Sequence, residues 1–142
     1  EMCIRDRDSE ALEKADILLA DVPCSGLGVI GRKTDIKYNI SQAGIQELAA
    51  LQRKILEQAS TYVKPGGTLI YSTCTVTPEE NIENVQWFTE HYPYELESLD
   101  PYLCEELRGE TTKEGYLQLL PGIHHCDGFF IARLKRKTEW NR

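Results

Sequence analysis

Two cysteines of this sequence lie in segments whose residue types suit nucleophilic chemistry. Cys24 belongs to residues 21–26, which read DVPCSG, and Cys74 closes residues 72–74, which read STC. A thiolate is a strong nucleophile, so two thiols that meet suit covalent catalysis or reversible thiol pairing. Taken singly, a cysteine is more often a small buried apolar residue than a nucleophile. The functional interpretation therefore depends on whether the fold brings these two cysteines together.

The sequence around the two thiols predicts two strands joined by a helix. Residues 15–21 and 68–73 are short apolar runs typical of strands, and the first has the pattern of a strand buried on both faces. From an N-capping Ser41, apolar residues recur at steps of three and four, which predicts a helix. Residues 64–67 (KPGG) end that helix. Strand, helix and strand in this order form a βαβ unit with parallel strands.

Both thiols then follow the carboxyl ends of the two strands. In open α/β sheets, ligands bind at this edge. If the strands are neighbours, about 5 Å apart, then Asp21, Cys24 and Cys74 converge on one pocket.

The rest of the sequence predicts a second helix and a C-terminal hairpin. Thr77 as N-cap, Pro78 at the first helical position and Glu80 as the capping-box residue begin a helix that runs to about Tyr92. The later pieces are a strand over residues 94–99, an acidic loop through Gly109, and a hairpin of residues 116–120 and 128–134. The fold class is α/β.

Length and composition indicate one domain with a core of its own. The chain has 142 residues, of which 41% are hydrophobic. Its longest apolar runs are far below the roughly 20 residues that span a membrane. The net charge of −7 argues against a nucleic acid partner, but residues 76–110 hold ten acidic residues and one basic residue. The remainder is therefore slightly basic and could face RNA.

Two further patterns are weaker. Residues 26–31 (GLGVIG) fit the dinucleotide-binding pattern, but the polar, aperiodic residues 32–39 stand where a helix should meet the pyrophosphate. We interpret these glycines as allowing a tight loop. His124, His125 and Cys126 with Cys104 match no common zinc spacing, so no metal site is expected. The five cysteines form no C-x-x-C pair, which indicates reduced thiols and a cytoplasmic protein.

Residues 21–28 (DVPCSGLG), 72–75 (STCT) and 78–81 (PEEN) together resemble the RsmB/NOP (Sun-type) family of RNA cytosine-5 methyltransferases. Residues 127–134 (DGFFIARL) match the C-terminal strand of that family. The resemblance runs from about Ala15 to Lys137. Within the family, residues 28–30 (GVI) and 35–37 (DIK) look most like RsmB, which modifies 16S ribosomal RNA.

The resemblance implies a Rossmann-like methyltransferase fold and a role for each matching residue. The implied reaction is S-adenosylmethionine-dependent methylation of carbon 5 of a cytosine in ribosomal RNA. Cys74 matches the nucleophile that adds to the base, and Cys24 matches the second cysteine, which assists release. Asp21 matches the aspartate that lies between methyl donor and base and helps to hold both. Pro23 leaves nearby backbone groups free to meet the base edge.

The resemblance also implies that this chain is the C-terminal half of the catalytic sheet, without the N-terminal cofactor half. We expect residues 1–8 to be a non-native start, residues 9–137 to be a partial methyltransferase domain, and residues 138–142 to be a tail. Such a fragment should bind the cofactor weakly and methylate little. Basic side chains at positions 32, 33 and 37 suit RNA phosphates, and suit a solvated basic loop equally well.

Two alternatives remain open from the sequence. The half-domain could be a non-catalytic RNA- or protein-binding module, although such a module has no chemical need for two thiols. It could also be a thiol redox protein, in which Cys24 and Cys74 pair reversibly.

Overall fold

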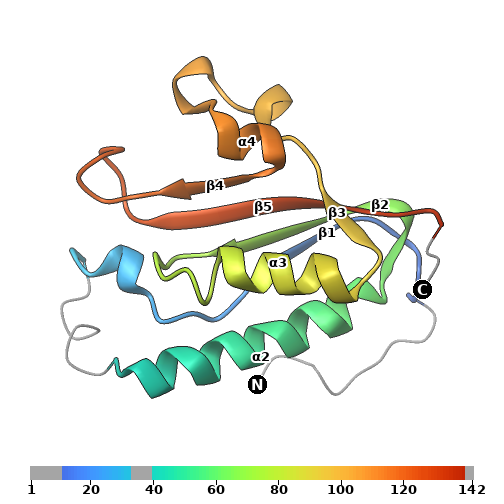
Figure 1. The fold of residues 1–142 in the computed structure, drawn as a ribbon, viewed down its shortest axis with the longest axis horizontal. Coiled ribbons are helices and arrows are strands. Elements are labelled where there is room, and N and C mark those ends of the chain that lie inside the picture. The colour runs from blue at the N-terminus through green and yellow to red at the C-terminus, as the bar shows by residue number, and fades with distance from the viewer. Residues whose placement is uncertain (1–10, 33–39, 140–142) are drawn as a thin grey trace.

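The computed structural model describes residues 11–32 and 40–139, which form a five-stranded sheet with its two longest helices on one face (Figure 1). The strands are β1 (Ala15–Asp21), β2 (Val63–Thr73), β3 (Tyr94–Leu96), β4 (Tyr116–Leu119) and β5 (Phe129–Arg136). The helices are α2 (Gln42–Ser60), α3 (Ile82–His91) and the short α4 (Glu110–Glu114). Figure 1 shows α2 and α3 on one side of the sheet and α4 on the other. The α/β fold class is therefore confirmed.

The sheet order is β1-β2-β5-β3, and β4 pairs with β5. β1 and β2 are parallel, and their register pairs Asp21 with Ser72 at the carboxyl ends. The predicted βαβ unit is thus confirmed. β5 runs antiparallel to β2 and also pairs antiparallel with β4, which confirms the predicted C-terminal hairpin.

The boundary between α2 and β2 differs from the predicted one. Ser41 caps α2 as predicted, because its side chain accepts the Gly44 N–H at 3.1 Å. The helix ends at Ser60, however, and β2 begins at Val63 opposite Ala15. The KPGG segment is therefore not a helix stop but an irregular start of the strand. Gly66 adopts a positive φ of 78° there, a conformation that glycine reaches without strain.

The second helix begins later than the capping-box pattern predicted. Residues 78–81 form a turn, and α3 starts at Ile82. The Glu80 side chain accepts the Thr77 hydroxyl at 2.6 Å, and it also accepts hydrogen bonds from Ser25 and Gln52, so it binds the preceding turn and distant segments together.

β1 is buried on one face only, so the prediction of a strand buried on both faces is wrong. Ile17 and Leu19 are 70% and 67% exposed, whereas Ala20 is buried. The reason is that α2 and α3 cover a single side of the sheet (Figure 1).

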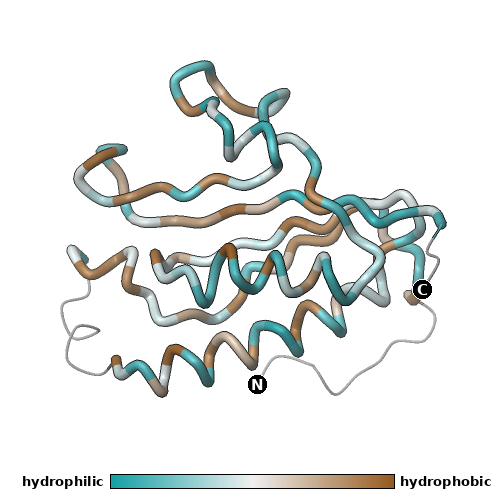
Figure 2. Tube along the Cα trace, in the orientation of Figure 1, coloured by the Kyte–Doolittle hydropathy of each residue, from teal (hydrophilic) through white to brown (hydrophobic). Residues whose placement is uncertain are grey.

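The core lies between that covered face and the two helices. Figure 2 shows apolar residues along β1, β2 and β5, in the middle of the molecule. The fully buried apolar side chains come from both layers and comprise Leu56, Val63, Leu69, Tyr71, Val85, Phe88, Ala132 and Leu134. No helix in the described part of the chain is long and apolar enough to cross a membrane.

Candidate active site

The carboxyl edge of β1 and β2 brings two thiols into contact. The Sγ atoms of Cys24 and Cys74 lie 3.1 Å apart, and both side chains are half-buried. Each cysteine follows the end of its strand, and the parallel register aligns those ends. The two other described cysteines, Cys104 and Cys126, are exposed. The structure thus places in one pair the two cysteines that the sequence singled out.

Burial sets the protonation of one member of the pair. It raises the pKa of the Cys24 thiol to about 12, and the hydrogen bond with Cys74 contributes in the same direction. Both effects disfavour a negative charge on the half-buried Cys24 sulfur. At neutral pH, Cys24 therefore keeps its proton and can donate it in a hydrogen bond to the Cys74 sulfur.

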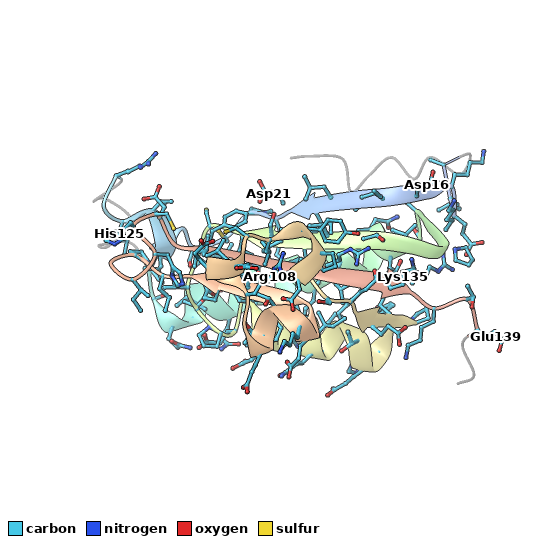
Figure 3. All side chains as sticks on the ribbon, turned by 90° about the horizontal axis from the view of Figure 1, so that it is seen from above. Asp16, Asp21, Arg108, His125, Lys135 and Glu139 are labelled. Atoms are coloured by element: carbon cyan, nitrogen blue, oxygen red, sulfur yellow. The ribbon has the colours of Figure 1, made fainter. Side chains whose placement is uncertain are left out.

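Asp21 lies at the same edge, at the last position of β1. Its Oδ1 accepts the Ser72 hydroxyl at 2.8 Å, and its side chain is exposed. Figure 3 shows Asp21 projecting from the β1 margin of the sheet. One carboxylate oxygen is thus held by the neighbouring strand, while the side chain can still meet a ligand.

Pro23 lies in the turn between Asp21 and Cys24, and its own carbonyl is already occupied. The Gln52 side-chain amide donates to the Pro23 oxygen at 3.0 Å. The resemblance implied free backbone groups around this proline, and the structure shows that its carbonyl is not one of them.

The glycine-rich loop after the thiol turn is a tight connection rather than a phosphate cradle. Gly26 has a φ of 72°, and the three residues that follow form a 3₁₀ turn, Leu27–Val29. Gly28 donates to the Cys74 carbonyl at 3.1 Å and accepts the Gly128 N–H at 2.7 Å. A Cβ at Gly28 would lie 2.3 Å from the Gly128 oxygen. Only glycine fits this approach, which supports the interpretation of the glycines as permitting a tight loop.

The basic residues beside this loop are only partly described. Arg32 pairs with Asp127 at 3.0 Å, and its side chain is 79% exposed. Lys33 and Lys37 lie outside the described residues. His124 accepts the Leu120 N–H through Nδ1, and no group of three metal-ligating side chains occurs within residues 11–32 and 40–139.

Sequence reasoning missed the polar side chains that lie beneath the thiols. Glu80 and Gln52 are fully buried, and both hydrogen-bond to the turn that carries Cys24. Glu80 belongs to the PEEN segment of residues 78–81, which the sequence analysis singled out. Its spacing of three residues after Thr77 also fits a helix cap, so its contacts with the Cys24 turn were not predicted.

Comparison with known proteins finds similarity over most of the chain. A family model described as 16S rRNA methyltransferase RsmB/F matches residues 2–135. Ribosomal RNA small subunit methyltransferase F of Cronobacter sakazakii is 43% identical over 128 residues, which make up 89% of this chain and 27% of that protein. The protein of the same name from Shigella flexneri serotype 5b is 44% identical over 128 residues, with 89% and 26% coverage. The chain thus spans about a quarter of the length of these relatives.

Solved structures show the same fold. The crystal structure of PH0851 superposes with a TM-score of 0.77 at 36% identity, covering 87% of this chain and 27% of that one. The crystal structure of NSun6 from Pyrococcus horikoshii with SFG gives a TM-score of 0.70 at 30% identity, covering 86% and 30%.

Proposed function

Because this chain belongs to the RsmB/F family of 16S rRNA methyltransferases, we propose that it is the C-terminal part of a catalytic domain that methylates carbon 5 of a cytosine in ribosomal RNA. The observation that carries this proposal is the 3.1 Å contact between the thiols of Cys24 and Cys74. The family model does not separate the B and F types, and the two relatives described above carry the F name. The resemblance to the B type stays a prediction.

A thiol nucleophile solves the central difficulty of this reaction. Carbon 5 of cytosine is a poor nucleophile until a thiolate adds to carbon 6. That addition forms a sulfur–carbon bond and moves a ring electron pair onto carbon 5, which then takes up a methyl group. Loss of the carbon 5 proton returns the electron pair to the ring and breaks the sulfur–carbon bond. The site therefore needs one thiolate that adds to the base and a group that helps this sulfur to leave the base afterwards.

The two thiols suit this division of roles. Cys24 keeps its proton at neutral pH because burial raises its pKa to about 12. Its S–H can donate to the Cys74 sulfur and stabilise a negative charge there. Following the resemblance, Cys74 is the nucleophile in this proposal, and Cys24 assists release of the product. The reaction requires reduced thiols, which suits a cytoplasmic protein.

S-adenosylmethionine supplies the methyl group in this proposal. Asp21 is the residue of this chain that fits such a ligand, because its exposed carboxylate can accept from an ammonium or amino group while Ser72 holds one oxygen. One of the similar structures was solved with SFG, an analogue of S-adenosylmethionine. Asp21 is the one donor contact that this proposal assigns to the chain, so we expect residues 1–142 alone to bind the cofactor weakly and methylate little.

The RNA substrate must present an unpaired or flipped cytosine, since a stacked base cannot reach a half-buried thiol. Asp21 and the turn at Pro23 lie where the base would enter. Arg32 is exposed beside this edge and suits a phosphate contact. The acidic stretch of residues 76–110 would repel RNA, so we expect RNA to bind elsewhere on the molecule.

The test is covalent trapping on RNA that contains 5-azacytidine, with a full-length protein that carries this segment. The unmodified protein and a Cys104→Ala control should form an adduct that survives denaturing gels, because Cys104 is exposed and outside the thiol pair. Cys74→Ala should form none. Cys24→Ala should accumulate adduct even on ordinary RNA, because release is impaired.

Two outcomes would contradict the proposal. An adduct with Cys74→Ala would refute the assigned nucleophile. RNA binding without any adduct, in every variant, would favour the non-catalytic binding module.

A further inference from the structure

A buried carboxylate, that of Glu80, is hydrogen-bonded to the residue that follows Cys24. The Glu80 side chain is 0% exposed, and it accepts four hydrogen bonds. The donors are Ser25 N–H at 2.8 Å, Ser25 hydroxyl at 2.5 Å, Gln52 amide at 2.9 Å and Thr77 hydroxyl at 2.6 Å. None of the ion pairs between described residues involves Glu80. Because a buried carboxylate is costly to desolvate, an apolar residue would serve simple packing better.

The donors to Glu80 hold the residues on both sides of Cys24. Ser25 follows this cysteine, and both its backbone and its hydroxyl bond to the carboxylate. Pro23 precedes it, and its carbonyl accepts from the same Gln52 amide that donates to Glu80. The turn that carries the first thiol is therefore fastened at two points to one buried carboxylate.

The segment that carries Cys74 is tied into the same network. The hydroxyls of Ser25 and Thr75 lie 2.7 Å apart, which links the residues that follow the two cysteines. Asn81, the neighbour of Glu80, donates to the Thr75 carbonyl at 3.1 Å and accepts the Thr73 hydroxyl at 2.6 Å. Two adjacent side chains thus bind both thiol-bearing segments.

We propose that Glu80 is a positioning residue, whose buried carboxylate holds the Cys24 turn against the Cys74 segment and so sets the distance between the two thiols. Its effect on methyl transfer rests on the function proposed above. The effect of Glu80 on the distance between the two sulfurs does not depend on that function.

The first test measures sulfur proximity in the 142-residue chain, as the rate at which the thiol oxidant diamide joins Cys24 and Cys74 in a disulfide. Glu80→Ala leaves the Ser25 N–H and the Gln52 amide without their acceptor, so the rate should fall about tenfold or more. The rate of disulfide formation in Glu80→Gln should stay within about twofold of the rate in the unmodified chain. Its carbonyl can still accept from Ser25 N–H and Gln52, while its amide can donate to the two hydroxyls.

Two controls separate positioning from loss of stability. Glu83→Ala removes an exposed carboxylate three residues away and should leave the rate unchanged. Leu134→Ala removes a fully buried core side chain towards the other end of β5, and should lower the free energy of unfolding without slowing disulfide formation in the folded chain. If Glu80→Ala does not fold, Ser25→Ala replaces it. That variant removes the hydroxyl link to Thr75, and its disulfide rate should fall as well.

The proposal is overturned if a folded Glu80→Ala forms the disulfide as fast as the unmodified chain. It is also overturned if Glu80→Gln is as slow as Glu80→Ala while both fold. The same variants in the full-length protein should change adduct formation on 5-azacytidine RNA in the same order. If disulfide rates follow Glu80 but no variant forms an adduct, the positioning role stands and the proposed function fails.

Discussion

Asp21 and Ser72 are register partners at the ends of two parallel strands, and the Ser72 hydroxyl donates to the Asp21 carboxylate at 2.8 Å. This pairing explains why two thiols fifty residues apart meet. Each strand ends at the same level, so the cysteine that follows each end arrives at the same place. The 3.1 Å separation of the sulfurs is thus a product of strand register, and is then fixed by the polar network around Glu80.

Mild oxidation should join Cys24 and Cys74 specifically. With diamide as the oxidant, each thiol loses its hydrogen and a sulfur–sulfur bond forms, so the chain should become lighter by two hydrogens. Peptide mapping should find the link between these two cysteines, and either Cys24→Ser or Cys74→Ser should abolish it. Disulfides between Cys104 and Cys126 as the main product would contradict the geometry.

Alkylation should separate Cys24 from the exposed cysteines by its pH dependence. Because burial raises its pKa to about 12, only about one molecule in 10,000 carries the thiolate at pH 8. Its reaction with iodoacetamide should therefore be far slower than that of Cys104 or Cys126 and should keep rising above pH 9. The raised pKa also favours the protonated folded state, so this contribution to stability is present at neutral pH and is lost as pH rises towards 12. Mass spectrometry of each peptide measures the rates, and equal rates at pH 8 would count against the shift.

Gly28→Ala should destabilise the chain by about 1–3 kcal/mol. The added methyl group would meet the Gly128 and Cys74 carbonyl oxygens at 2.3 and 2.7 Å, both of them backbone atoms that cannot move aside cheaply. Gly31→Ala is the matched control, since a Cβ there meets nothing within 4 Å, and it should change stability by less than about 0.5 kcal/mol. Urea unfolding followed by tryptophan fluorescence measures both. Equal losses from the two substitutions would show that the close approach at Gly28 does not exist.

The single covered face of the sheet predicts different costs for two leucines. Leu69→Ala removes a fully buried side chain from β2 and should cost about 2–5 kcal/mol. Leu19→Ala, on the adjacent strand β1, changes a side chain that is 67% exposed and should cost less than about 1 kcal/mol. Denaturant unfolding of the two variants and of the unmodified chain measures both losses of stability. A large loss from Leu19→Ala would mean that something covers the outer face of β1 in the isolated chain.

The sequence was sufficient for the features that depend on local pattern and chain direction. Apolar runs located β1 and β2, and the rule that βαβ strands are parallel placed Cys24 near Cys74. Predictions from the sequence were incomplete or wrong where a residue has partners that are distant in the chain. Glu80 has the spacing of a helix cap and does bond to the nearby Thr77, yet it also accepts from Gln52 and Ser25, which lie 28 and 55 residues away. The run that contains Ile17 and Leu19 reported apolar character correctly, but a run of residues carries no information about which face of a sheet the helices will cover.

The backbone of Gly28 lies between two other segments, because it donates to Cys74 and accepts from Gly128. The sheet edge is therefore closed by three pieces of chain that are far apart in sequence, and every such closure costs loop entropy before any contact repays it. A ribosome delivers these pieces in order, so the Cys74 segment emerges well before Gly128. The contact of Gly28 with Gly128 can form only after residue 128 has been synthesised, so this part of the edge closes later than the contact between Gly28 and Cys74 can.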